Sequence, residues 1–466
     1  MSQYPPDTLG LPKEEMIRLG YRVVDLVVEH FCTKDKQRVI ETGSPAALRA
    51  KLGGPLPLEP GDADAAINLL VAVALANQQH GDHPRYFARV PGPSSFAAVL
   101  GEWLGTGFNA IAASWTGGSG PTSIELIVIE WLRELIGLPP ETEGILVSGG
   151  SIANLTAIGT ARAIYGPGVA YLTDQTHSSL MRGLHHLNFP LTHIRVVKTD
   201  GGQRMKQTEL RRAIAEDRAG GRRPLIVLAT AGTTNTGAVD PLNAIADLCA
   251  ENAMWFHVDG AYGAPSAICE QGRRYLSGIE RADSIAIDPH KWLFQPYDIG
   301  CLLTTRPGSL ERAYAMHPEY LRDVEGQSGE VDLRNRGLEL SRRSRALKLW
   351  MTFRTYGANR IRDAIQRGIE LAEHAEKILR ARPQTWDVVT PAQIGVVTFR
   401  MKGASASDHE RSVSILAESG YAAVSSTRVK GQSVLRLCTI NPLTTETDIS
   451  ETLDRLAEAM RNPRYE

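Results

Sequence analysis

Residues 284–293, SIAIDPHKWL, combine a short apolar strand with a lysine just past its end. The alternation of side chains in SIAI predicts a β-strand, which Pro289 ends before His290 and Lys291. In α/β folds, ligands bind beyond the carboxyl ends of the strands. Burial there lowers the pKa of a lysine and leaves its amine able to attack an aldehyde. We therefore predict that Lys291 is a reactive group, although most lysines are solvated surface residues.

A second short strand, WFHVD at residues 255–259, ends in an aspartate. His257 and Asp259 are two residues apart and therefore point to the same face of the strand. A carboxylate buried at the end of a strand needs a cationic partner, and a protonated pyridine nitrogen is one. An aspartate for the ring nitrogen and a lysine for the aldehyde carbon are the anchors of pyridoxal 5′-phosphate. Asp259 and Lys291 together therefore predict a pyridoxal phosphate site.

The DPHKW and HVDGAY motifs, at residues 288–292 and 257–262, resemble those of the group II pyridoxal-phosphate decarboxylases. This family includes aromatic-amino-acid, histidine, glutamate and cysteine-sulfinate decarboxylases. The resemblance extends from about His83 to the C-terminal region, with several motifs in family order. It implies a fold-type I enzyme in which Lys291 carries the cofactor covalently and Asp259 keeps the ring nitrogen protonated.

Residues 145–162, ILVSGGSIANLTAIGTAR, are typical of a strand, a Gly-Gly turn and a helix. Ser151 stands at the expected N-cap, and the amides of a helix N-terminus behind a glycine turn bind anions. The turn lacks the lysine of nucleotide-binding loops, so it suits one phosphate group better than a triphosphate. A plain structural turn is the usual explanation of Gly-Gly before a helix. Beside the two anchors, however, we assign Gly150 and Ser151 to the cofactor phosphate.

The resemblance implies further contacts with the cofactor. The DQTHSS motif at residues 174–179 would place His177 flat over the pyridine ring. A lone histidine on a loop is more often simply exposed to solvent, but the matching neighbours favour the cofactor role. The other contacts implied in this way are Thr234, Ala261, Asp288 and His290. Of these, Ala261 would lie on the opposite face of the ring, and His290 would contact the phosphate or exchange protons.

The composition of the 466 residues is that of an ordinary globular protein, 42% hydrophobic and 22% charged. A net charge of −1 recruits neither nucleic acid nor an anionic membrane. The longest apolar run, at residues 69–76, is too short to span a bilayer, and no signal peptide is visible. The five cysteines have no metal-binding spacing, which predicts reduced thiols, no metal site and a cytoplasmic location.

Apolar strands near residues 145, 169, 225, 255 and 284 alternate with helical segments. This pattern predicts an α/β fold with a mainly parallel sheet, of the seven-stranded type by resemblance, in a large domain at residues 83–357. Residues 358–466 should form a small α+β domain. Residues 1–82 should form a helical arm, with one helix over residues 62–77. The arm has an apolar stripe, and the resemblance implies a homodimer with the active site at its interface. The alternative is that the arm packs on its own large domain.

These residues predict a pyridoxal-phosphate-dependent carboxy-lyase that converts an L-amino acid to the amine and carbon dioxide. The bond to the α-carboxylate must stand perpendicular to the ring plane, because only then does it overlap the π system. By resemblance, His177 and Arg436 would hold that carboxylate, although Arg436 is equally well explained as a surface arginine on a strand. Another fold-type I lyase, or an interaction protein that has kept the fold, stays open. The presence of Lys291, Asp259 and His177 together argues against an interaction protein.

The substrate class is left open by the sequence. Four positions that are aromatic in animal aromatic-amino-acid decarboxylases are Gly81, Arg89, Val90 and Ala113 here, which removes stacking surface. Trp115 and Tyr297 could compensate for that loss, and we weakly favour an aromatic or bulky L-amino acid. The alternative is glutamate, aspartate or cysteine sulfinate, with which Arg89 could pair unless it is a solvated rim residue.

Tyr320, in HPEYLRD, lies in a long charged segment at residues 312–338, which is typical of a functional or mobile loop. The resemblance implies that Tyr320 gives a proton to the substrate Cα after carbon dioxide leaves. Related aldehyde synthases typically have phenylalanine there, so the tyrosine favours a simple decarboxylase. An oxygen-dependent decarboxylating aldehyde synthase is the alternative, and Tyr320 could also merely pack.

Overall fold

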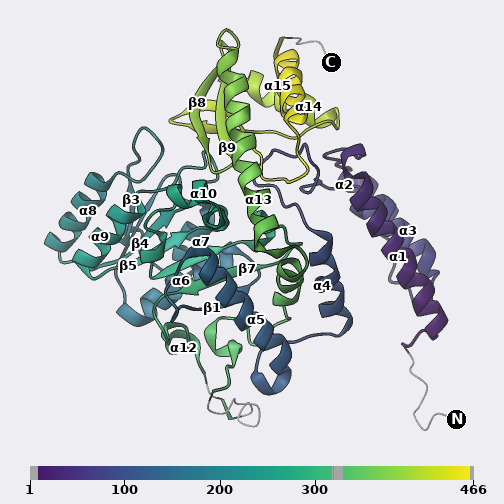
Figure 1. The fold of residues 1–466 in the computed structure, drawn as a ribbon, viewed down its shortest axis with the longest axis horizontal. Coiled ribbons are helices and arrows are strands. Elements are labelled where there is room, and N and C mark those ends of the chain that lie inside the picture. Colours follow the sequence, from purple (N-terminus) through teal and green to yellow (C-terminus); the bar gives the residue numbers. More distant parts are fainter. Residues whose placement is uncertain (1–8, 317, 320–328, 462–466) are drawn as a thin grey trace.

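A seven-stranded sheet forms the centre of the large lobe of the molecule (Figure 1). The computed structural model describes residues 9–316, 318–319 and 329–461. The strands are β1 (Glu143–Val147), β2 (Val169–Thr173), β3 (Ile194–Val197), β4 (Pro224–Thr230), β5 (Trp255–Asp259), β6 (Ser284–Ile287) and β7 (Gly300–Thr304). They lie in the order β1-β7-β6-β5-β4-β2-β3. Only β7 is antiparallel to its neighbours, β1 and β6, so the prediction of a mainly parallel sheet is confirmed.

Helices cover both faces of this sheet. They are α4 (Phe96–Gly107), α5 (Trp115–Ile136), α6 (Gly150–Tyr165), α7 (Ser178–His186), α8 (Gln207–Ala219), α9 (Leu242–Asn252), α10 (Glu270–Tyr275), α11 (Pro289–Trp292) and α12 (Ser309–Tyr314). In β4, Val227 and Ala229 belong to the core beneath α5, α8 and α9, whereas Ile226 and Leu228 belong to the core beneath α6 and α7. Alternate residues of a strand point to opposite faces, so each strand supplies both cores.

The carboxyl ends of β5 and β6 meet at one edge of the sheet. The two strands are parallel, with Asp259 opposite Ala286. Phe256 and Val258 point into the core beneath α8 and α9, so Asp259 points to the α6 side. The chain leaves β6 and turns at once into α11, which carries Lys291. The end of β5 and the start of α11 therefore place a carboxylate and an amine beside α6.

A smaller lobe contains a four-stranded antiparallel sheet in the order β10-β11-β9-β8 (Figure 1). Its elements are β8 (Trp386–Gln393), β9 (Val396–Met401), α14 (Ala406–Glu418), β10 (Ser425–Val429), β11 (Gln432–Cys438) and α15 (Glu446–Arg461). The long helix α13 (Ala346–Ala381) leads from the large lobe into it and is broken at Gly357, where φ is 72° and ψ is 157°. The helix thus breaks one residue before the predicted boundary at residue 358, and that division into domains stays a prediction.

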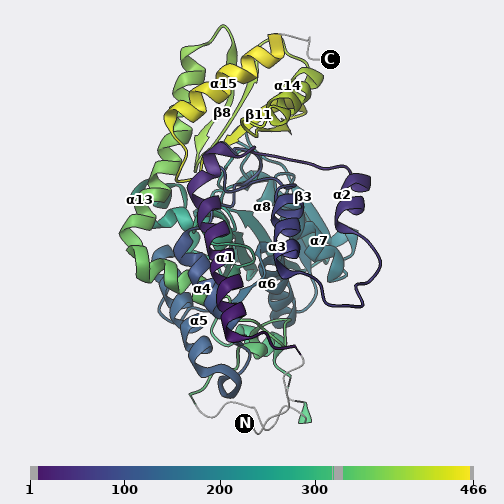
Figure 2. The ribbon, with the colours of Figure 1, turned by 90° about the vertical axis from the view of Figure 1, so that its right-hand side faces the viewer.

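The N-terminal arm consists of helices that stand beside the large lobe (Figures 1 and 2). They are α1 (Lys13–Thr33), α2 (Pro45–Leu52) and α3 (Ala63–Leu69), with a π-helical turn, η2 (Leu70–Leu75). Arg18 and Arg22 of α1 form ion pairs with Asp64 of α3. The predicted α-helix over residues 62–77 is thus too long, since α3 gives way to wider turns in which the Ala76 N–H donates to the Val71 carbonyl. Within the described ranges, no helix is both long and apolar enough to cross a membrane.

Candidate active site

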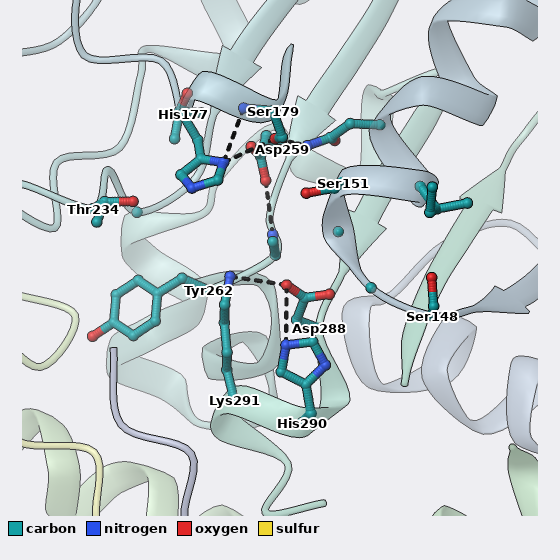
Figure 3. A pocket seen from close by; sticks show the side chains of 17 residues that line it. Ser148, Ser151, His177, Ser179, Thr234, Asp259, Tyr262, Asp288, His290 and Lys291 are labelled. Carbon is teal, nitrogen blue, oxygen red and sulfur yellow. Dashed lines mark hydrogen bonds and ion pairs between the residues drawn. The ribbon is translucent and has the colours of Figure 1, made fainter. Parts of the chain in front are cut away.

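A cavity of about 370 Å³ opens where β4 and β5 end and α11 begins, beside the N-terminus of α6 (Figure 3). Its walls come from five segments of the chain. They are the turn before α6, the start of α7, the ends of β4 and β5 with the turns that follow them, and α11. The cavity therefore lies at the carboxyl edge of the parallel strands, where α/β sheets bind ligands.

The amine of Lys291 reaches into this cavity from α11, and the side chain is 22% exposed. Its Nζ lies 2.9 Å from Asp288 Oδ2. Burial is the largest effect and lowers the pKa of Lys291, but the carboxylates of Asp288 and Asp259 together with Tyr297 outweigh it, and the net pKa shift is upward. The expectation that burial would give Lys291 a low pKa is therefore wrong. Asp288, three residues earlier in the DPHKW motif, forms an ion pair with the amine.

The carboxylate of Asp259 is buried at the end of β5. Its Oδ2 accepts a hydrogen bond from Asn154 Nδ2 at 3.1 Å, and its Oδ1 accepts one from the Ala261 N–H at 3.1 Å. Neutral donors, rather than a cationic side chain, thus hold this carboxylate within the part of the chain that the structure describes. Asp259 remains able to hold a protonated nitrogen of a bound molecule.

The imidazole of His177 lies at the start of α7 on the wall of the cavity (Figure 3). Its Nδ1 is 2.8 Å from Ser179 Oγ and 3.3 Å from the Ser179 backbone nitrogen. His177 is the N-cap residue of α7 and accepts from that N–H. The cap fixes the position of the ring, which leaves its other nitrogen free to face a ligand.

The N-terminus of α6 differs from expectation in one respect. Gly149, not Ser151, is the N-cap residue, and no side chain caps this helix. Gly150 instead allows a close approach, since a Cβ there would lie 2.8 Å from Asp288 Oδ2 and 3.0 Å from Ala261 Cβ. A helix N-terminus that no side chain caps suits an anion, so Ser151 and Gly150 still line a site suited to one phosphate group.

His290 lies on the other side of Asp288, with Nε2 3.6 Å from Asp288 Oδ2. Its Nδ1 is 2.7 Å from the Ile299 carbonyl oxygen, which fixes the ring. Burial lowers the pKa of His290 although Asp288 acts in the opposite direction. A neutral His290 that donates from Nδ1 to the carbonyl keeps Nε2, which lies beside Asp288, without a hydrogen.

All nine residues that the sequence assigned to the cofactor line this one cavity. They are Gly150, Ser151, His177, Thr234, Asp259, Ala261, Asp288, His290 and Lys291. Their roles toward a cofactor stay predictions. Tyr320 lies outside the described residues.

Four of the residues predicted to bind the substrate do not line the cavity. Arg89 has a positive φ of 49° and donates from Nη1 to Gln79 Oε1. Arg436 is buried beneath it and donates to the Arg89 carbonyl, with Nε and Nη2 unpartnered among the described residues. Trp115 begins α5, with its backbone N–H bonded to Asp332.

Tyr297, the fourth of these residues, lies closer to the cavity. Its ring packs against that of His290, with centroids 4.6 Å apart, and 65% of the residue is exposed. A Cβ at Gly92 would lie 2.8 Å from the Tyr297 hydroxyl oxygen. Because Gly92 has no side chain, it leaves room for Tyr297, which presents an aromatic ring beside the cavity.

The cavity suits pyridoxal phosphate on three grounds. An amine and a carboxylate, those of Lys291 and Asp259, converge on it from adjacent segments. Uncapped amides of α6 lie at one wall. Two buried oxygen atoms, Thr230 Oγ1 and Asp288 Oδ1, have no hydrogen-bond partner among the described residues, so a ligand with donors or bound water would satisfy them.

Residues 63–402 match the model of the pyridoxal-dependent decarboxylase conserved domain. The chain belongs to this family. An aromatic-L-amino-acid decarboxylase from Bacillus atrophaeus is 41% identical, over 97% of this chain and 96% of the relative. A phenylacetaldehyde synthase from Arabidopsis thaliana is 30% identical, over 95% of both chains. The crystal structure of Oryza sativa TDC with PLP and tryptamine has a TM-score of 0.92 at 27% identity, covering 98% of this chain and 99% of that one.

The protein is therefore a pyridoxal-phosphate-dependent amino acid decarboxylase, as the sequence motifs predict. Sequence reasoning missed several residues of the decarboxylase site: Ser148, Ile152, Asn154, Ser179, Thr230, Gly232 and Tyr262. A signal existed for two of them. Asn154 is one helical turn after Gly150 and so lies on the same face of α6, and Ser179 is in the motif that contains His177.

Proposed function

We propose that this decarboxylase converts an aromatic L-amino acid to the corresponding amine and carbon dioxide. The observation that carries the reaction is the convergence of Lys291, Asp259 and His177 on one cavity. The relative from Bacillus atrophaeus, whose name states an aromatic substrate, supports the substrate class. The exposed ring of Tyr297 beside the cavity also supports it, because it offers a stacking surface.

Pyridoxal phosphate, when bound, supplies an electron-withdrawing ring that stabilises the electron pair left by the departing carboxylate. Lys291 would hold the aldehyde carbon, and Asp259 would hold the proton on the ring nitrogen. Ser151 and the amides at the start of α6 would bind the phosphate. His177 would cover one face of the ring and donate from its outer nitrogen to the substrate carboxylate.

An acidic substrate has less support from the geometry. Among the residues that the structure describes, those lining the cavity include no arginine. Arg89 donates to Gln79 instead, and the one partnered nitrogen of Arg436 donates to a backbone carbonyl. A carboxylate side chain would thus meet no guanidinium in the cavity wall, whereas an aromatic ring would meet Tyr297.

Tyr320 is proposed as the residue that protonates the substrate Cα, which would make the amine rather than the aldehyde the main product. Two phenylacetaldehyde synthases among the relatives are 30% and 32% identical, compared with 41% for the aromatic-L-amino-acid decarboxylase. A homodimer and a cytoplasmic location complete the proposal. The exposed apolar side chains of the arm support the dimer.

Trapping the cofactor on the protein tests the core of this proposal. Borohydride reduction of the yellow enzyme should leave a pyridoxyl group on Lys291, found by peptide mapping. Lys291→Ala should abolish the label, whereas Lys206→Ala, at an exposed lysine, should retain it. A label on another lysine would refute the assignment of Lys291.

The substrate and product are tested by measuring carbon dioxide, amine and aldehyde from a panel of amino acids under air. We expect release from aromatic L-amino acids, with amine as the main product. Turnover confined to glutamate, aspartate or cysteine sulfinate would overturn the substrate class. Aldehyde as the main product of the unmodified enzyme would overturn the role of Tyr320.

A further inference from the structure

A chain of hydrogen bonds behind the cavity passes through Asn154, a buried residue of α6 that is 1% exposed. Its Nδ2 lies 3.1 Å from both Asp259 Oδ2 and Ser179 Oγ. Its Oδ1 lies 2.9 Å from His257 Nε2. One amide group therefore contacts the carboxylate at the end of β5, the serine that bonds to His177, and a buried histidine.

Chemistry fixes the orientation of this amide. A carboxylate oxygen only accepts hydrogen bonds, so the NH₂ group of Asn154 must face Asp259. The Asn154 oxygen then faces His257, which must carry its hydrogen on Nε2 to donate to it. Burial lowers the pKa of His257 to about 3, so the ring is neutral and its Nδ1 is an acceptor.

The far end of the chain agrees with this assignment. His257 Nδ1 lies 2.8 Å from Ser284 Oγ, and Trp255 Nε1 lies 2.8 Å from the same oxygen. An indole N–H can only donate, so the serine oxygen accepts from Trp255 and its own hydrogen is available to His257. Every donor on this side of Asn154 therefore has an acceptor.

The second N–H of Asn154 points to Ser179 Oγ, which accepts it. The Ser179 hydroxyl hydrogen is then available to His177 Nδ1, and the Ser179 backbone N–H also points to that nitrogen. With two donors facing Nδ1, a neutral His177 carries its hydrogen on Nε2. Figure 3 shows this nitrogen on the side of the ring away from Ser179.

We propose that Asn154 is a positioning residue that orients the Asp259 carboxylate and, through Ser179, holds His177 with its Nε2–H toward the substrate. The inference rests on the proposed roles of Asp259 and His177. It assigns Asn154 a donor function on both branches, since both of its N–H groups are used. A side chain of the same shape without those hydrogens would fill the space but fail in the function.

Asn154→Asp provides that side chain. At pH 8.5, where the introduced carboxyl group is ionised and only accepts, we expect the dissociation constant for pyridoxal phosphate to rise by roughly tenfold or more, because Asp259 loses a charged hydrogen bond. As the pH falls to 5.5, the introduced group takes up a proton and can donate again. The ratio of the dissociation constants of variant and unmodified enzyme should therefore fall toward one. Titrating each apoenzyme with pyridoxal phosphate and following the absorbance measures the two dissociation constants.

Two further variants complete the test. Thr160→Val alters a buried residue of α6 that does not line the cavity and whose hydroxyl donates to the Thr156 carbonyl of the same helix, so its affinity for the cofactor should match that of the unmodified enzyme. Ser179→Ala keeps the partner of Asp259 but removes the hydroxyl donor to His177. We expect its cofactor affinity to change less than twofold, while kcat/KM falls roughly tenfold and its pH profile shifts.

The donor function of Asn154 would be overturned if the dissociation constant of Asn154→Asp, divided by that of the unmodified enzyme, stayed near one. It would also be overturned if that ratio were raised equally at every pH. Asn154→Asp could melt far below Thr160→Val and fail to bind pyridoxal phosphate. In that case Ser179→Ala is the deciding variant, and an unchanged pH profile of its kcat/KM would overturn the proposal. Failure of the proposed function is distinguishable, because borohydride would then leave no label on Lys291 of the unmodified enzyme.

Discussion

At the scale of single residues, the pairing of Lys291 with Asp288 controls the reactivity of the site. Their ion pair spans 2.9 Å and, together with Asp259 and Tyr297, outweighs the effect of burial, so the pKa of Lys291 is raised. Only the unprotonated amine attacks an aldehyde, and a raised pKa leaves less of it at neutral pH. Asp288 also lies against the start of α6, where the phosphate would bind. The carboxylate therefore opposes cofactor attachment in two ways.

Replacing Asp288 should make attachment of the cofactor faster. In Asp288→Asn, burial still lowers the pKa of Lys291 but the opposing carboxylate is gone, so more free amine is present at pH 7. We expect the apoenzyme to bind pyridoxal phosphate roughly tenfold faster, as one pKa unit would give. The advantage should shrink above the pKa of the unmodified Lys291, where both amines are free. Stopped-flow absorbance measures these rates.

Pyridoxal without the phosphate separates the two effects of Asp288. A larger fraction of unprotonated Lys291 should speed the attachment of both aldehydes. Relief of the repulsion between Asp288 and the phosphate should speed only the attachment of pyridoxal phosphate. Asp174→Asn, at an exposed position, should leave both rates unchanged. Equal rates for Asp288→Asn and the unmodified enzyme with both aldehydes would contradict the prediction.

At the scale of elements, the break in α13 joins the two lobes. Gly357 has a φ of 72° and a ψ of 157°, a conformation that is open almost only to glycine. A Cβ at Gly357 would meet no atom within 4 Å, so crowding does not require the glycine there. The backbone alone requires it, and the direction in which the second half of α13 leaves the large lobe depends on this residue.

Gly357→Ala should therefore destabilise the protein through backbone strain. We expect the apparent free energy of unfolding to fall by about 1–3 kcal/mol. Gly20→Ala is the matched control, because Gly20 lies inside α1 and a Cβ there also meets nothing within 4 Å. It should be neutral or stabilising by about 0.4–1 kcal/mol. Urea unfolding of both variants measures the difference, and equal stability of the two would show that the break tolerates a side chain.

At the scale of the whole molecule, the N-terminal arm leaves apolar surface uncovered. Helix α1 has no buried residue, although it carries an apolar stripe. Exposed apolar side chains on α1, α3 and η2 include Met16, Ile17, Tyr21, Leu69, Leu70 and Leu75. Large exposed apolar patches mark interaction sites, and a symmetric dimer would cover the same patch on both copies.

We accordingly expect a homodimer in solution that depends on the arm. Leu70, 53% exposed on η2, lies on this patch, whereas Leu191, 80% exposed, lies on η3 (Leu191–His193), far from the arm in the sequence. Leu70→Glu should shift the protein toward monomer because it would bury a charge in the dimer interface. Leu191→Glu should leave the dimer intact. Light scattering coupled to gel filtration distinguishes the two species, and a fully active monomeric unmodified enzyme would contradict the dimer.

The sequence alone determined the fold class and the cofactor. Strand periodicity, the HVDGAY and DPHKW motifs and the Gly-Gly turn are local patterns, because strands, turns and helix starts depend on neighbouring residues. Together with the family resemblance that the motifs carry, they were sufficient to assign nine residues that the fold then gathers in one cavity. The lysine at 291 and the aspartate at 259 could be paired in advance because parallel strands bring their carboxyl ends together.

Only the tertiary structure decided how these groups act on one another. The pKa of Lys291 depends on a competition between burial and nearby charge, and its outcome depends on the 2.9 Å between the Lys291 and Asp288 side chains, which the letters of the DPHKW motif do not fix. Asn154 looked like an ordinary helix residue until packing placed its amide between Asp259, His257 and Ser179. Arg89 and Arg436 do not line the cavity, and instead Arg89 donates to Gln79 and Arg436 donates to the Arg89 carbonyl. Local patterns determine which elements form, whereas hydrogen-bond partners and electrostatics depend on which elements meet.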